Sequence, residues 1–133
     1  MGPAGKTEYV EAVNALCGEH LPKVLAATNG GHPKPYPIAV FLKEQPRLEQ
    51  LTVDFDKRFE SIPVPEDGKP VAEAFDQYRA AGDAATDRLQ TAADAGDQKA
   101  FDEAFEANLK EFETSDTRTD LLSFGITAEC NAR

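Results

Sequence analysis

The sequence predicts an all-α fold, specifically an antiparallel four-helix bundle with a short fifth helix at the C-terminus. Apolar side chains recur every three or four residues through most of the chain, which is the spacing of one helix face. Alternation typical of a strand never extends beyond a few residues, and short connections favour antiparallel neighbours. For a chain of 133 residues we expect an unstructured or vector-derived start over 1–6 and a single bundle domain over 7–133.

The first helix is predicted within "KTEYVEAVNALCGEHLPKVLAATNGG", with Thr7 as its N-cap. Pro22 lacks a backbone N–H, so we expect the helix to kink or restart around Leu21. Gly30 or Gly31 should end it as a left-handed cap. The apolar face comprises Tyr9, Val13, Leu16, Cys17, Leu21, Val24 and Leu25.

A proline-rich connector, "HPKPYP", precedes the second helical region, "IAVFLKEQPRLEQLTVDFDKRFESI". Pro46 should interrupt this region in the same way as Pro22 interrupts the first. The apolar stripe beyond it comprises Leu48, Leu51, Phe55, Phe59 and Ile62.

The second half predicts two further long helices and a short one. Pro70 suits the first position of the third helix and Gly96 its end, while Asp97 is a good N-cap for the fourth. Thr117 should cap the fifth, which ends at Gly125. Seven aromatic side chains are expected to fill the core rather than to line a ligand cavity: Phe55, Phe59, Phe75, Tyr78, Phe101, Phe105 and Phe112.

The composition is strongly acidic, with a formal net charge of −10. Residues 61–133 hold 16 Asp+Glu against 7 Lys+Arg, so most of that charge lies in the second half. Such a surface repels phosphate backbones and anionic lipid head groups, which argues against nucleic-acid binding and leaves a cation or a basic partner open. No run of 18 apolar residues and no signal peptide is present, so we expect no transmembrane segment in this chain.

The two cysteines, Cys17 and Cys130, lie near opposite ends of the chain, 113 positions apart. An antiparallel four-helix path brings the chain end back toward its start, so the two thiols can come within disulfide distance. A disulfide between them would require an oxidising compartment. The alternative is two unpaired buried cysteines, each packed as a small apolar residue.

Four segments resemble small exported, lipoprotein-like helical proteins of actinobacteria, most of which have no assigned function: "YVEAVNALC", "FESIPVPEDGKPVAEAF", "AADAGDQKAF" and "FGITAEC". The resemblance implies a disulfide from the first helix to the tail, between Cys17 and Cys130. It also implies an extracytoplasmic location, either secreted or envelope-anchored, with a lipid anchor on a longer precursor as one form.

Catalytic chemistry finds little support. Nucleophilic catalysis needs a nucleophile, a base and an orienting group, and the only histidines are His20 and His32. His20 lies one turn from Cys17 but fits a surface or capping role better, and "GGHPKPYP", with His32 and Tyr36, fits a rigid turn better than a haem or copper contact. We therefore expect no catalytic residue, no metal site and no cofactor.

The acidic residues are expected to serve structural or solvating roles. Asp94 and Asp97 flank Gly96 as helix-stop and N-cap chemistry. A solvated face should carry Asp102, Glu103 and Glu106. Because the chain is so acidic, paired carboxylates for acid–base catalysis stay open as a third hypothesis, although no pair stands out by spacing.

The leading hypothesis is a non-enzymatic, extracytoplasmic binding or interaction domain of the cell envelope, with a protein or small-molecule partner. The alternative is a carrier that holds a small apolar or haem-like ligand between helices, with His20 or His32 as the polar contact.

Overall fold

The computed structural model describes residues 5–132 and is all-helical over that range. Five α-helices follow one another as α1 (Lys6–Ala27), α2 (Ile38–Glu60), α3 (Lys69–Asp94), α4 (Gln98–Glu113) and α5 (Asp116–Ser123). Two short 3₁₀ segments, η1 (Glu66–Gly68) and η2 (Ala128–Ala132), complete the structure. The all-α prediction with a short fifth helix is confirmed. Of the predicted unstructured start, residues 1–4 lie outside the described residues, whereas Lys6 is already helical.

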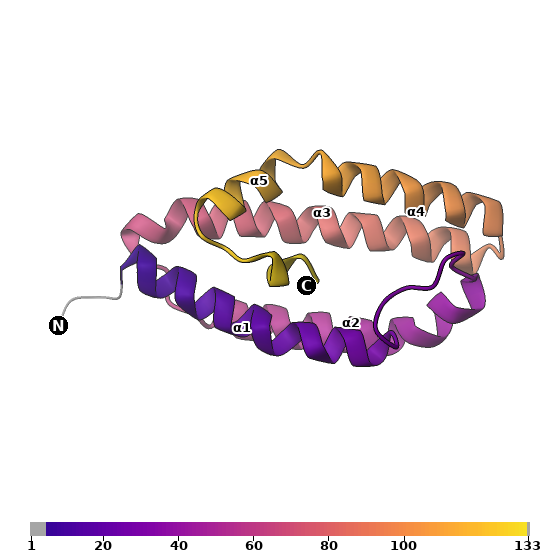
Figure 1. Ribbon diagram of the computed structural model, residues 1–133, viewed down its shortest axis with the longest axis horizontal. Coiled ribbons are helices and arrows are strands. Elements are labelled where there is room, and N and C mark those ends of the chain that lie inside the picture. The colour runs from indigo at the N-terminus through magenta and orange to yellow at the C-terminus, as the bar shows by residue number, and fades with distance from the viewer. Residues whose placement is uncertain (1–4, 133) are drawn as a thin grey trace.

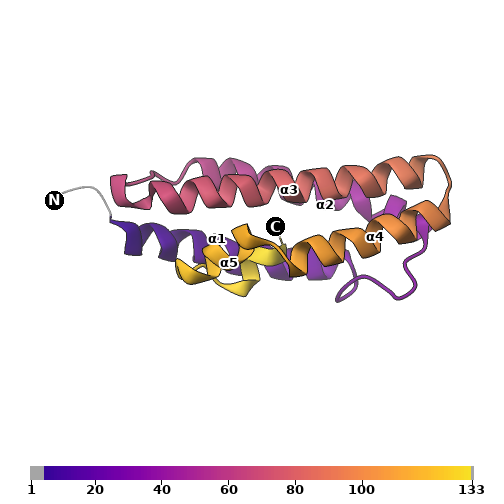
Figure 2. The ribbon, with the colours of Figure 1, turned by 90° about the horizontal axis from the view of Figure 1, so that it is seen from above.

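The four long helices run along the length of an elongated molecule (Figures 1 and 2). α1 packs against α2, α3 packs against α4, and α2 also contacts α3. α5 packs on α3, and the chain then turns back so that η2 lies against α1. The C-terminal segment therefore lies between the first helix and the second half of the molecule.

Neither internal proline breaks its helix. Pro22 lies within α1 and Pro46 within α2, so the predicted restarts are wrong. Both residues are exposed, so water can bind the backbone carbonyl that a proline leaves without its helical donor.

Three of the predicted caps are shifted by one or two residues. The N-cap of α1 is Gly5, whose N–H donates to the Glu8 carboxylate at 3.0 Å, rather than Thr7. At the other end of α1, Asn29 is the first residue with a left-handed φ of 53°, ahead of Gly30. Ser115, and not Thr117, caps α5 by accepting from the Arg118 N–H. By contrast, Asp97 caps α4 as predicted, accepting from the Ala100 N–H at 3.0 Å.

The interior divides into two clusters of buried side chains. The first, which we call the disulfide core, draws on α1, α2, α3, α5 and the tail: Tyr9, Val13, Leu16, Cys17, Phe55, Phe59, Val71, Phe75, Leu121, Ile126 and Cys130. The second, the aromatic core, joins the α1–α2 connection to the ends of α2, α3 and α4: Tyr36, Phe41, Ala92, Ala93 and Phe101. The two clusters have α2 and α3 in common and occupy different lengths of these two helices.

Between the two cores, α3 is bare in the sense that it contributes no side chain to either core. Residues 80–84 of this helix are all exposed, and neither core takes a side chain from α3 between Tyr78 and Leu89. We call this stretch the waist. It is where the helices leave room for grooves.

The aromatic prediction is correct for some positions and wrong for others. Phe55, Phe59, Phe75 and Phe101 are buried, whereas Tyr78, Phe105 and Phe112 are only half-buried. Leu25 is 40% exposed although it falls on the predicted apolar face of the first helix, and Leu109 of α4 is 43% exposed. Near the C-terminal end of α4, the apolar stripe therefore has an incomplete cover.

Candidate functional site

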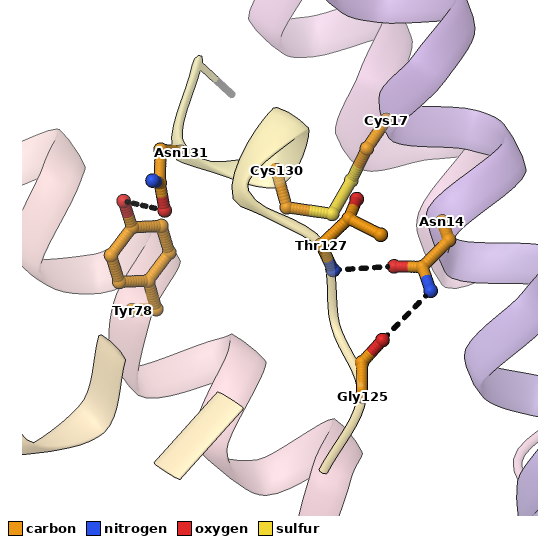
Figure 3. Close-up of a disulfide and its surroundings, with 7 residues drawn as sticks. All are labelled: Asn14, Cys17, Tyr78, Gly125, Thr127, Cys130 and Asn131. Carbon is orange, nitrogen blue, oxygen red and sulfur yellow. Dashed lines mark hydrogen bonds between the residues drawn. A yellow bond between two sulfur atoms is a disulfide. The ribbon is translucent and has the colours of Figure 1, made fainter. Parts of the chain in front are cut away.

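A disulfide joins Cys17 in α1 to Cys130 in the tail (Figure 3), with the two Cα atoms 4.9 Å apart. Both cysteines are buried, at 0% and 2% exposure. The prediction of this bond is confirmed, and the alternative of two unpaired cysteines is wrong.

Asn14 supports the disulfide one turn earlier on α1 (Figure 3). Its Nδ2 donates to the Gly125 carbonyl at 2.9 Å, and its Oδ1 accepts from the Thr127 N–H at 2.9 Å. Both partners lie in the tail, where Gly125 has a left-handed φ of 97° and Ile126 is buried. The sequence analysis did not identify Asn14, because an asparagine on the flank of a helix carries no signal for a partner more than a hundred residues away.

The two histidines lie apart. His20 is 5% exposed, and its ring lies 4.9 Å from that of Phe55. His32 stacks on Tyr36 at 4.7 Å and lies edge-on to Phe105 at 6.2 Å. His20 is therefore buried in the interior rather than at the surface or in a cap, and Cys17, one turn away, is held in the disulfide.

The acidic residues named above serve local roles. Asp94 accepts from Gln90 at 2.7 Å, and Asp102, Glu103 and Glu106 are exposed, in agreement with a solvated face. Over residues 5–132, no three His, Cys, Asp or Glu side chains come together in a way that could hold a metal ion.

A groove of ≈ 490 Å³ runs along the waist between α2 and α3. The described residues that line it include four carboxylates and no Lys or Arg. Its full lining is Val24, His32, Gln45, Leu48, Glu49, Thr52, Val53, Asp56, Gly82, Asp83, Thr86, Asp87 and Gln90. We call it the acidic groove, and it faces solvent along its length.

Asp56, one of the carboxylates of the acidic groove, takes part in an ion-pair network that joins α2 to α3. Asp56 pairs with Arg79 at 3.3 Å, and Arg79 also pairs with Glu60 at 3.4 Å and with Asp76. Burial by itself would lower the pKa of Arg79, but the hydrogen bonds and charges of Asp76 and Asp56 raise it. Arg79 also lies 4.5 Å above the Phe59 ring, so this cation ties α3 to α2.

His32, which lines the acidic groove, also contacts the aromatic core through its stacking on Tyr36. Partial burial of the ring lowers the pKa of His32, and the Glu44 carboxylate opposes this shift. Tyr36 donates its hydroxyl to Glu44 at 3.1 Å. Burial, together with Glu44, raises the pKa of Tyr36 well above its ordinary value.

A second, smaller concavity of ≈ 160 Å³ lies on the other flank of α3. α3, α4, the start of α5 and the tail line it through Tyr78, Ala81, Gly82, Ala85, Asn108, Glu111, Phe112, Ser115 and Asn131. We call it the α3–α4 hollow. Only Gly82 lines both this hollow and the acidic groove.

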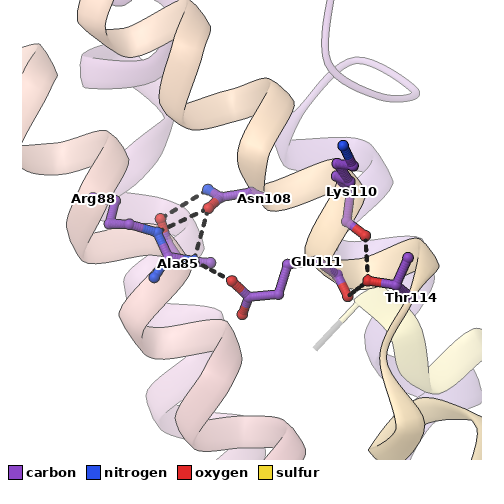
Figure 4. A network of polar contacts seen from close by, with 6 residues as sticks. All are labelled: Ala85, Arg88, Asn108, Lys110, Glu111 and Thr114. Carbon is purple, nitrogen blue, oxygen red and sulfur yellow. Dashed lines mark hydrogen bonds and ion pairs between the residues drawn. The ribbon is translucent and has the colours of Figure 1, made fainter.

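A polar network holds α3 and α4 together beside the α3–α4 hollow (Figure 4). Asn108 donates to the Ala85 carbonyl at 2.9 Å and accepts from Arg88 at 2.9 Å. Arg88 also pairs with Glu111 at 2.8 Å. The positions of Asn108 and Glu111 on α4 are therefore determined by α3.

Comparison with protein-family models, with curated proteins and with solved structures finds no match to this chain. Within the described part of the chain, no helix has both the length and the apolar composition needed to cross a bilayer.

Proposed function

We propose that this chain is a non-catalytic binding domain whose principal surface is the acidic groove. The observation that carries this proposal is the opposition of α2 and α3 across an open concavity lined by Glu49, Asp56, Asp83 and Asp87, with no Lys or Arg among its described lining. Carboxylates gathered in a groove raise the local concentration of positively charged partners and repel anionic ones.

The partner we propose is an extended basic segment of another protein. The groove also presents Val24, Leu48 and Val53, against which the aliphatic stems of Lys or Arg side chains can lie while their charged ends reach the carboxylates. Nucleic acid does not fit this surface, because phosphate would meet the same four carboxylates.

A peptide titration tests the proposal. An eight-residue peptide of alternating Lys and Ala should bind in calorimetry at low salt, and binding should weaken as salt rises. Replacing Asp83 and Asp87 by Asn should weaken binding about 2- to 30-fold, the range expected for two exposed charge pairs. The control replaces Asp102 by Asn and Glu103 by Gln on α4, outside the groove. An equal loss in the control would contradict a role for the groove.

We further propose an extracytoplasmic location, supported by the buried disulfide, since such bonds persist in oxidising compartments. The resemblance to small exported actinobacterial proteins points the same way. Alkylation of cells that express the full-length protein, without reduction, tests it. Both thiols should stay unlabelled after denaturation; labelling of Cys17 and Cys130 would place the protein in a reducing compartment.

A haem-like ligand is the less favoured alternative. His20 lies in the interior against Phe55, and His32 borders a groove whose carboxylates would repel haem propionates.

We also propose that the four long helices act as one antiparallel bundle, in which α2 and α3 form the central pair.

A further inference from the structure

We propose that the α3–α4 hollow is a second binding site, which takes a neutral molecule with a single aromatic ring and one hydroxyl group. It is separate from the acidic groove, and neither proposal depends on the other.

The size of the hollow suits one ring. Its volume is ≈ 160 Å³, whereas pockets for drug-sized ligands measure about 300–1,000 Å³. An apolar cavity of about 150 Å³ is known to accept benzene. Haem and long acyl chains are too large.

The lining is apolar where a ring would lie. Ala81, Gly82 and Ala85 of α3 line it, and Ala85 shares a helix face with the other two because it lies three residues from Gly82 and four from Ala81. The rings of Tyr78 and Phe112 border that strip. The Arg118 guanidinium packs on the Phe112 ring, 4.4 Å from its centroid.

The polar rim determines which ring is preferred. Glu111, Ser115 and Asn131 offer oxygen atoms that can accept a hydrogen bond. The Glu111 charge is already met by Arg88 at 2.8 Å, so the site has little excess charge with which to attract a cation. A neutral hydroxyl that donates one hydrogen bond is therefore favoured over an amine, and a carboxylate is disfavoured.

The C-terminal tail, which the disulfide holds in place, forms one wall of the hollow through Asn131, and we call this wall the cover. Asn131 lines the hollow and directly follows Cys130. Its Oδ1 accepts from the Tyr78 hydroxyl at 3.5 Å (Figure 3). The bond between Cys17 and Cys130 thus holds one wall of the site in place, and we expect ligand affinity to depend on the oxidation state of that bond.

The test uses 4-fluorophenol as the probe, observed by ¹⁹F NMR with the oxidised protein. We expect a saturable shift with a dissociation constant of about 1 mM or tighter, since small ligands gain a large free energy per atom. Replacing Ala81 by Leu fills the hollow and should weaken binding at least about tenfold, close to the loss of one ring's contacts. The matched control, Ala84→Leu, changes an exposed position of α3 that lines neither concavity, and should leave binding unchanged.

No saturable shift, or equal binding by the Ala81→Leu variant and the unsubstituted protein, would overturn the proposal. 4-Fluorobenzoate should bind more weakly than 4-fluorophenol; tighter binding of the benzoate would overturn the assigned ligand class.

A second arm tests the cover. Reduction should abolish the shift of 4-fluorophenol while circular dichroism shows that the helices persist; binding that survives reduction would overturn the role of the tail. If reduction also removes the helical signal, the variant Asn131→Ala in the oxidised protein tests whether the tail contributes to binding. That variant should bind about 2- to 12-fold more weakly, the range for one lost hydrogen bond, and unchanged binding would refute the cover.

Discussion

The disulfide core and the aromatic core share α2 and α3 but are closed by different means. The disulfide core gathers residues from almost the full length of the chain and is closed by a covalent bond between positions 113 apart. The aromatic core is closed by the connection between α1 and α2, where Tyr36 lies edge-on to Phe41 at 6.1 Å and to Phe101 at 5.3 Å. One end therefore depends on a cross-link and the other on ring packing, and the bare waist lies between them.

Gln98, the first residue of α4, completes the aromatic core in place of a cross-link. Its Nε2 donates to the Tyr36 carbonyl at 2.9 Å, and its Oε1 accepts from the Ile38 N–H at 2.9 Å. A single side chain thus holds both ends of the turn that leads into α2. The difference between the two cores predicts how each should fail.

The largest effect should follow loss of the cross-link. Replacing Cys17 and Cys130 by Ala should lower the free energy of unfolding by about 4–5 kcal/mol, because the bond closes a loop of about one hundred residues in the unfolded chain. Urea titration of the oxidised protein, the reduced protein and the variant measures this. A loss of only about 1 kcal/mol would mean that packing alone holds the tail.

The next largest losses of stability should follow substitutions that leave a large cavity, and these should show whether the two cores unfold independently. Phe75→Ala and Phe101→Ala each remove a fully buried ring and should cost about 3–5 kcal/mol. Hydrogen exchange should show that Phe101→Ala loosens mainly α4 and the start of α2, whereas Phe75→Ala loosens α1 and the start of α3. The same pattern of exchange in both variants would show that the waist transmits unfolding and that the cores are one unit.

A smaller loss is expected at the turn that Gln98 holds. Gln98→Ala removes three hydrogen bonds, two to the turn and one to the exposed Asp102 carboxylate, and should cost about 1–2 kcal/mol, toward the lower end because the side chain is exposed. Gln77→Ala, at an exposed position of α3, provides the control and should be nearly neutral in the same thermal or urea unfolding experiment. If Gln98→Ala left the free energy of unfolding unchanged, packing of the aromatic rings alone would hold the turn.

The smallest effect should be a pH dependence of stability that comes from His32, whose ring stacks on Tyr36 of the aromatic core. Burial lowers the pKa of His32 in the folded protein below its ordinary value of about 6.5. The unfolded chain therefore binds more protons in this window, so stability should fall as pH drops from about 6.5 toward the folded pKa. NMR titration should give a His32 pKa below 6.5, lowered further in Glu44→Gln; His32→Gln should remove this part of the pH dependence.

Helix positions were predictable from spacing, but the degree of burial was not. Phe101 and Phe112 belong to one apolar stripe of α4, yet Phe101 is fully buried and Phe112 is half-buried. The difference arises because the connection after α1 covers the start of α4 with a ring, Tyr36, whereas Phe112 near the end of α4 lines the open α3–α4 hollow. Pro22 and Pro46 were predicted to interrupt helices because their local cost is real, but exposed carbonyls and packing on the opposite face outweigh it.

Gln98, Asn14 and the strip from Ala81 to Ala85 could not have been identified as important from local sequence. Their roles depend on partners 60 or more residues away, or on neighbours that fail to cover them. An asparagine, a glutamine or an alanine has the same local signal whether it faces solvent or a distant segment.

By itself the sequence determined the helical class, the approximate course of five helices, the N-cap at Asp97 and the acidic balance, because these follow from periodicity and from side-chain chemistry within a few residues. Tertiary structure alone decided that the core would divide in two, that α3 would be bare at its waist, and that a tail held by Cys130 would wall the α3–α4 hollow. The physical reason is that burial is a property of pairs of surfaces, and the second surface of each pair comes from a distant part of the chain.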